Sequence, residues 1–392
     1  MKKVFVVLLS VLCVLTLAGC GKSDNGGGND TGDGTVTVKL GGSGPLSGDA
    51  KVYGEAVRNA AQIAVDEINA SDSRIKFDFR MEDDEADGEK AYNAYSTLYD
   101  WGMQVSLLTV TSGAGAAVAA SYDEDKIFAI TPSGSSTALV YTDSKNFKGN
   151  FQMCFTDPNQ GVATADYLAS YFGGYKVAVI YKSDDVYSAG VYEKFTAEAE
   201  AKGVSVVYVG AFTDDTSTDF STQLTAAKDC NANLVYLPIY YQPASLILKQ
   251  AFDMAYAPIF FGIDGMDGIL TLEGFDTSLA EGVYLLTPFA ADAEDALTKN
   301  FVTTYQNKFG DTPNQFAADA YDCVYAIKQA LENMGYDGKM SSEELYDAMI
   351  AQFTSMTFDG VTGNNMTWAE NGEVSKAPKA VIIIDGVYVS AE

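Results

Sequence analysis

The sequence KVAVIY at residues 176–181 decides the fold class, because it is a short apolar run with its one charged residue at the start. A run of this length and composition is typical of a strand buried on both faces, as in parallel sheets. A helical pattern follows at 189–202, and a second apolar run follows at 204–209. Strand, helix and strand in this order predict one unit of a parallel α/β sheet.

The same alternation extends in both directions from this unit. Downstream, it predicts helices at 220–228 and 244–254 and strands at 234–237 and 258–261; upstream, it predicts strands at 36–40, 75–81, 105–110 and 127–130, with helices at 53–69, 89–101 and 114–122. We therefore expect an α/β protein with two doubly wound, Rossmann-like lobes and parallel sheets. Less regular helices follow at 295–309, 314–334 and 342–352, and the tail at 380–389 predicts a hairpin turned at Asp385-Gly386.

Ligands of open parallel sheets bind outside the carboxyl ends of the strands, so these positions are candidate site residues. The first series carries the small, hydroxyl-rich stretches TSGAG at 111–115 and TPSGSST at 131–137. Each alone is typical of a helix cap, but two on neighbouring strands favour a site for an anionic group. The second series offers Tyr187, Tyr240 and Asp264 at its strand ends. A solvated loop acid is the alternative interpretation of Asp264.

Several motifs occur in an order that is specific as a set. They are GPLSG at 44–48 with Tyr53-Gly54, AVDEINA at 64–70, Asp83-Asp84, Thr111-Ser112, ITPS at 130–133, DPNQG at 157–161 and Asp219-Phe220. On these residues the chain resembles the leucine/isoleucine/valine-binding protein family, the branched-chain amino-acid receptors of ABC importers. The second half matches mainly in its β/α spacing.

The resemblance implies a type I periplasmic binding protein fold and a site that holds a free amino acid. It implies that Ser112, beside Thr111, and Ser135 hold the ligand carboxylate, and that Ser133, Ser135 and Asp264 meet the ammonium. It further implies that Tyr53, Tyr187 and Tyr240 line the side-chain pocket. The family commonly has Thr at the Ser135 position, and some members have Glu at the Asp264 position. No cofactor and no metal are implied.

The resemblance also implies how the lobes divide the chain. We expect a first lobe of residues 36–155 and 284–357 and a second lobe of residues 156–283 and 358–392, joined by a hinge of several crossovers. The expected partners are an amino acid and an ABC permease with its ATPase, and the protein is expected to be a monomer that is not an enzyme.

The N-terminus predicts export and anchoring. Residues 1–19 combine a basic start with an apolar run too short to span a membrane, as in a signal peptide. The ending Leu17-Ala18-Gly19-Cys20 resembles a bacterial lipobox, which implies a lipid on Cys20 and a location on the extracytoplasmic face of the bacterial cell membrane. Residues 20–35 are rich in Gly, Ser, Asn and Asp and predict a flexible tether. An ordinary cleaved signal is the alternative.

Composition removes several classes of function. The net charge of −28 argues against nucleic acid as a partner. The complete absence of histidine removes His-dependent hydrolases and zinc sites of the H-E-x-x-H type. Cys154, Cys230 and Cys323 are expected to be small core residues, although one disulfide among them stays open. Two rivals to the amino-acid receptor are kept: a receptor of the same fold for an amide, short peptide or other solute, and a hydrolase built on Asp and Ser.

Overall fold

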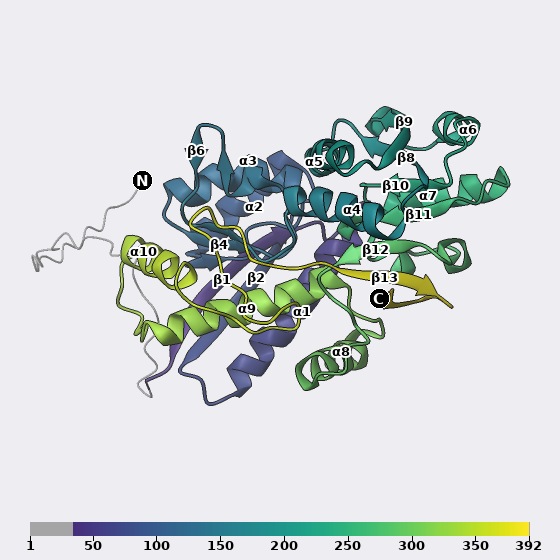
Figure 1. Cartoon of the computed structure of the whole chain (residues 1–392). Helices are drawn as coiled ribbons and strands as arrows, with labels where there is room; N and C mark the ends of the chain where they lie inside the picture. The colour runs from purple at the N-terminus through teal and green to yellow at the C-terminus, as the bar shows by residue number, and fades with distance from the viewer. Residues whose placement is uncertain (1–33, 392) are drawn as a thin grey trace, which may run out of the picture.

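The computed structural model describes residues 34–391 and shows two lobes, each built on its own sheet (Figure 1). The first sheet has the order β2-β1-β3-β4-β7, and every neighbouring pair in it is parallel. Its strands are β1 Val36–Gly44, β2 Ile75–Asp83, β3 Val105–Ser106, β4 Phe128–Thr131 and β7 Asn150–Gln152. The predicted parallel sheet of the first series is therefore confirmed.

Helices cover both faces of the first sheet. Side chains of α1 and α9 belong to one buried cluster and those of α2 and α3 to another, so the sheet separates two apolar layers. The helices of this lobe are α1 Lys51–Ala70, α2 Gly88–Trp101, α3 Ser112–Glu124, α8 Ala296–Phe309, α9 Gln315–Asn333 and α10 Ser342–Phe353, with the short elements η1 Thr137–Leu139, β5 Tyr141–Thr142 and β6 Lys145–Asn146.

The second sheet has the order β14-β13-β12-β11-β10-β8-β9, and its two last strands in the chain run antiparallel to their neighbours. The strands are β8 Lys176–Lys182, β9 Ser205–Phe212, β10 Leu234–Leu237, β11 Ile259–Gly262, β12 Tyr284–Thr287, β13 Lys379–Ile384 and β14 Val387–Ser390. The helices are α4 Asp157–Tyr171, α5 Val186–Lys202, α6 Ser221–Asp229 and α7 Tyr241–Asp253, with the short turns η2 Asp214–Thr216, η3 Asp264–Met266, η4 Ile269–Thr271 and η5 Thr277–Ala280. The predicted hairpin is present, and its turn residues Asp385 and Gly386 both have positive φ.

The third strand is shorter than its sequence predicts. The apolar run 105–110 predicts six strand residues, yet β3 ends at Ser106. Leu108 has a φ of 53°, a left-handed conformation that interrupts a β ladder. Beyond this break the chain turns toward the start of α3, where Thr111 and Ser112 lie.

The connections between the lobes differ in two places from the expected boundaries. Strand β12 pairs with β11 and β13, so residues 284–287 belong to the second sheet rather than the first lobe. Residues 358–378 lie against the first lobe, where the Trp368 indole donates a hydrogen bond of 2.9 Å to the Gln152 carbonyl. The chain thus passes between the two sheets after β7, after β12 and before β13 (Figure 1).

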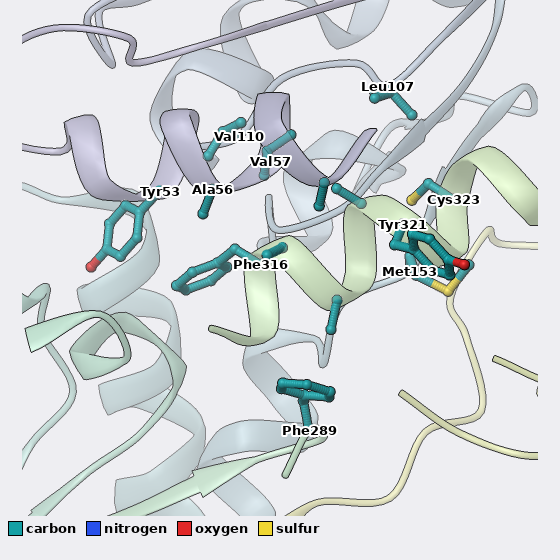
Figure 2. Close-up of a cluster of buried hydrophobic side chains, with 14 of the residues drawn as sticks. Tyr53, Ala56, Val57, Leu107, Val110, Met153, Phe289, Phe316, Tyr321 and Cys323 are labelled. Atoms are coloured by element: carbon teal, nitrogen blue, oxygen red, sulfur yellow. The ribbon is translucent and has the colours of Figure 1, made fainter. Parts of the chain in front are cut away.

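The largest buried cluster runs from α1 through α9 toward the connections between the lobes. Figure 2 shows Phe316 projecting from the start of α9 toward Tyr53 and Ala56 of α1, with Cys323 further along α9. Cys154 and Cys323 are buried and Cys230 is half-exposed; all three are free thiols. Within residues 34–391, no helix is long and apolar enough to cross a bilayer.

Candidate ligand-binding site

The eight side chains that the sequence singles out line one cavity between the two lobes. Tyr53, Thr111, Ser112, Ser133 and Ser135 come from the first lobe, and Tyr187, Tyr240 and Asp264 come from the second. Val110, Gly265 and Phe316 complete the lining. The space between these groups is about 10 Å³, room for about one water molecule, so the lobes are closed on each other here.

The first-lobe wall is built from hydroxyl groups at the ends of β3 and β4. Thr111 is the N-cap of α3 but makes no capping hydrogen bond, and its buried hydroxyl has no partner. The Ser112 hydroxyl accepts a hydrogen bond of 3.2 Å from the Ser136 N–H, and the Ser133 hydroxyl donates one of 2.6 Å to the Val110 carbonyl. With the N–H groups at the start of α3, this wall is suited to an anionic group.

A buried carboxylate behind this wall holds the strand ends in register. Asp84 accepts hydrogen bonds from the hydroxyls of Ser43 at 2.8 Å and Thr109 at 2.7 Å, and the Thr131 hydroxyl donates to the Thr109 carbonyl at 2.7 Å. Burial raises the pKa of Asp84, and these hydrogen bonds partly oppose that rise. Asp84 thus positions the hydroxyl wall without lining the cavity. Asp84 belongs to the Asp83-Asp84 motif, but the sequence alone predicts no role for it.

Asp264 faces the hydroxyl wall from the second lobe and is 2 % exposed. Its carboxylate accepts hydrogen bonds of 2.6 Å from the Tyr187 hydroxyl and 2.6 Å from the Gln160 amide. Burial raises the pKa of Asp264 to about 7, although both hydrogen bonds favour the charged form. Gln160, in the first turn of α4, contacts this carboxylate but was not among the predicted site residues; its only signal was its place in the DPNQG motif.

Aromatic rings fill the space between these two walls. Tyr240 stacks on Tyr187 at 5.2 Å between ring centroids, and the edge of Tyr53 meets Tyr240 at 5.3 Å. The ring centroid of Phe316 lies 4.6 Å from that of Tyr53. Phe316 was not among the predicted site residues, because only the packing of α9 on α1 brings it to the cavity. Rings of this kind give an apolar side chain a flat contact surface.

The protein itself makes the contacts that hold the two lobes together. The Tyr53 hydroxyl of the first lobe donates a hydrogen bond to the Gly265 carbonyl of the second. The Tyr241 hydroxyl donates in the opposite direction, to the Asp49 carbonyl at 2.6 Å. A ligand as large as an amino acid therefore requires the rings to shift or the lobes to separate, since the closed cavity holds about one water molecule.

The charge pattern of the cavity is one-sided. Among its lining residues Asp264 alone is ionisable near neutral pH, while the opposite wall carries hydroxyl and N–H donors without a formal charge. A ligand with a cationic end toward Asp264 and an anionic end toward the hydroxyl wall would complement both sides of the cavity. Two charged ends at a short, fixed separation are the property of a zwitterion.

Comparisons with known proteins agree with this arrangement. A family model described as periplasmic binding protein matches residues 37–381. The Leu/Ile/Val-binding protein BraC3 of Rhizobium johnstonii is 26% identical over 300 residues, which cover 74% of this chain and 78% of the relative. The crystal structure of the branched-chain amino acid transporter substrate binding protein LivJ of Streptococcus pneumoniae, in complex with isoleucine, is 26% identical with a TM-score of 0.80 and covers 91% of this chain and 99% of that one.

The fold is also shared with a protein that holds a different solute. A solute binding protein of an ABC transporter from R. palustris, in complex with benzoate, has a TM-score of 0.79 at 19% identity, covering 91% of this chain and 95% of that one. At this identity the likeness concerns the fold alone.

Two closed α/β lobes around a small enclosed cavity define a solute-binding protein, and the chain belongs to the periplasmic binding protein family. Such proteins bind solutes outside the cytoplasm and are not enzymes, so the hydrolase alternative is excluded. Within that family its relatives are Leu/Ile/Val-binding proteins, as the sequence motifs predict, and capture of an amino-acid solute is the activity they support.

Proposed function

We propose that the protein captures a single aliphatic amino acid between its lobes and delivers it to an ABC importer. The observation that carries the proposal is the buried carboxylate of Asp264, the one acidic group among the lining residues, opposite a wall of hydroxyl and N–H donors. Asp264 would bind the α-ammonium, with the Ser133 carbonyl and the Ser135 hydroxyl. Ser112 and the N–H groups of α3, beside Thr111, would bind the α-carboxylate.

The ligand side chain would lie against Tyr53, Tyr240 and Phe316, with Tyr187 behind Asp264. Their rings offer apolar faces, whereas the hydroxyls of Tyr53 and Tyr187 are already engaged with protein oxygens. This favours an aliphatic side chain over a polar one, and the isoleucine complex of the related Streptococcus pneumoniae protein supports it.

A receptor for a different solute is the second candidate, because the benzoate-bound protein has the same fold. Asp264 favours the amino acid over such a solute. A carboxylate this deeply buried would repel a ligand that carries only a carboxylate, such as benzoate, whereas an ammonium group compensates its charge. An amide or a short peptide would have to fit the same enclosed space.

Export and anchoring complete the proposal. Residues 1–19 would act as a signal peptide, and Cys20 would carry the lipid. Residues 20–35 would tether the lobes to the membrane. The protein would act as a monomer. Apart from residues 34 and 35, these segments lie outside the described residues. Globomycin treatment of expressing cells, which blocks cleavage of lipoprotein signals, should leave a precursor of larger mass.

Thermal unfolding against the common amino acids tests the binding proposal. After copurified ligand is stripped by unfolding and refolding, a ligand at 100 times its Kd should stabilise the protein by about 2.7 kcal/mol, which is several degrees in Tm. The Asp264→Asn variant should lose this shift, while a variant of the exposed Tyr171 should keep it. The absence of a shift with every amino acid would exclude the proposal and favour the second candidate.

A further inference from the structure

One buried carboxylate close to the ligand-binding site has no partner of its own. Asp157 is the first residue of α4 and is 3 % exposed. Neither oxygen of its carboxylate has a hydrogen-bond partner among the described residues. Burying a polar group without a partner is costly, so native proteins keep such groups mainly where a ligand or a function requires them.

The periodicity of two helices places this carboxylate beside Asp264. On α4, Asp157 and Gln160 are three residues apart and share one face of the helix, and on α5 the same holds for Tyr187 and Gly190. Gln160 and Tyr187 both donate to the Asp264 carboxylate. Gly190 instead adjoins Asp157, since a Cβ on it would lie 3.0 Å from a carboxylate oxygen. The two carboxylates are therefore neighbours between α4 and α5.

Asp157 also adjoins the first-lobe wall of the cavity. Its N–H donates a hydrogen bond of 3.0 Å to the Ser135 carbonyl, so α4 of the second lobe begins directly against a residue that lines the cavity. Asp157 is not itself a lining residue. Any effect that it has on a ligand therefore passes through Ser135 or through its own charge.

The charged groups that act on Asp157 are acidic. Burial raises the pKa of Asp157 well above its usual range, and the Ser135 hydroxyl lies close enough to oppose this rise. The charges of Asp264 and Asp185 raise the pKa of Asp157 further. A cation placed beside Ser135 would favour the charged form of both Asp157 and Asp264. The other titratable groups on which the charge of Asp157 acts are the Cys154 thiol and the hydroxyls of Tyr236 and Tyr240.

We propose that Asp157 is a positioning residue for the ammonium group of the ligand: it orients the Ser135 hydroxyl and adds a second negative charge beside Asp264. The inference rests on the proposed function, in which the ammonium binds Asp264 and the Ser135 hydroxyl. A hydroxyl that donates its hydrogen to Asp157 keeps its lone pairs for an N–H of the ammonium. When the ammonium arrives, the proton that ligand-free Asp157 holds is released to solvent, because the charged form is then favoured.

Calorimetry in two buffers of different ionisation enthalpy measures the protons that leave the protein when a ligand binds. The probes are leucine, isoleucine, valine and alanine, each at pH 5, 6, 7 and 8. Asp157→Asn should raise the Kd about tenfold at pH 8, because the ammonium loses one nearby charge. At one or more of these pH values the variant should release about half a proton less per ligand than the native protein does.

Asp123→Asn is the matched control, because it makes the same change at a buried carboxylate that has partners. Asp123 is 9 % exposed and lies in the last turn of α3, at the opposite end of that helix from Ser112. Its carboxylate accepts a hydrogen bond of 2.6 Å from the Tyr346 hydroxyl and pairs with Lys145 at 3.4 Å. This control should bind the probes and release protons as the native protein does.

Urea unfolding verifies that the Asp157→Asn protein is folded. Asn removes a buried charge that has no partner, so the ligand-free variant should be at least as stable as the native protein.

Asp157→Asn with a Kd within about twofold of the native value, or with native proton release at every pH, would overturn the role of Asp157 and leave amino-acid capture intact. An equal effect of Asp123→Asn would overturn it as well. A native protein that binds none of the four probes would instead overturn the proposed function, and this inference with it.

Discussion

Replacing Asp264 by Asn should make the protein more stable while abolishing its binding activity. The native carboxylate is buried, and its pKa rises from 3.8 to about 7 in the folded state because burial disfavours its charge. Folding therefore becomes less favourable as the pH rises from about 4 to about 7, since the folded state holds a proton that the unfolded state has released. Above pH 7 the full cost of the buried charge is present.

The size of this effect follows from the two pKa values. Each pKa unit corresponds to about 1.4 kcal/mol, so the rise in the pKa of Asp264 destabilises the folded protein by about 4 kcal/mol at pH 8. Asn keeps an acceptor for Tyr187 but turns its NH₂ toward the Gln160 amide, which loses one hydrogen bond worth about 1 kcal/mol. We therefore expect Asp264→Asn to gain about 1 to 3 kcal/mol at pH 8.

Urea unfolding of both ligand-free proteins at pH 8 and pH 5 measures this difference. The gain should shrink by about 2 to 3 kcal/mol at pH 5, where the native Asp264 is protonated in the folded protein. The other titrating groups contribute equally to the stability of both proteins, so their contributions cancel in the difference. A variant less stable than the native protein at pH 8, or a difference that does not change with pH, would refute the reasoning. The same protonation should weaken native amino-acid binding about tenfold per pH unit below 7.

Three further perturbations test the packing around the site. Gly54→Ala should cost several kcal/mol in urea unfolding, because its Cβ would lie 2.0 Å from the Pro45 carbonyl oxygen. Lys376→Met should cost about 3 to 5 kcal/mol by the same measurement, because it leaves the buried Asp319 without its 2.5 Å partner; an unchanged midpoint would contradict either prediction. Tyr241→Phe removes one hydrogen bond of the closed form and should raise the amino-acid Kd about fivefold by calorimetry, with little change in unfolding.

The parts of the site that could be predicted from the sequence follow from one geometric rule. Residues that come directly after parallel strands gather at one edge of a sheet, so Ser112, Ser133 and Asp264 reach the same cavity without any knowledge of helix packing. Phe316 and Gln160 could not be found in this way. Phe316 reaches the cavity through the packing of α9 on α1. Gln160 lies in the first turn of α4, where it contacts Asp264 of the same lobe.

The division of the chain between lobes was harder to predict for a similar reason. A buried strand such as 284–287 has the same apolar pattern in either sheet, and only its pairing with β11 and β13 assigns it. The early end of β3 depends on the left-handed conformation of Leu108, which an apolar run does not reveal. Local pattern thus predicts elements well, whereas their partners depend on contacts distant in sequence.

The distribution of the free thiols gives the protein a built-in reporter of its own unfolding. Cys230 is half-exposed on the second lobe, whereas Cys154 and Cys323 are buried, and burial raises the pKa of both their thiols. A maleimide dye should consequently react with Cys230 while the lobes stay folded and leave the other two unmodified, since thiolate is the reactive form. The second and third labels would then appear at the rate at which the core opens, without an engineered cysteine.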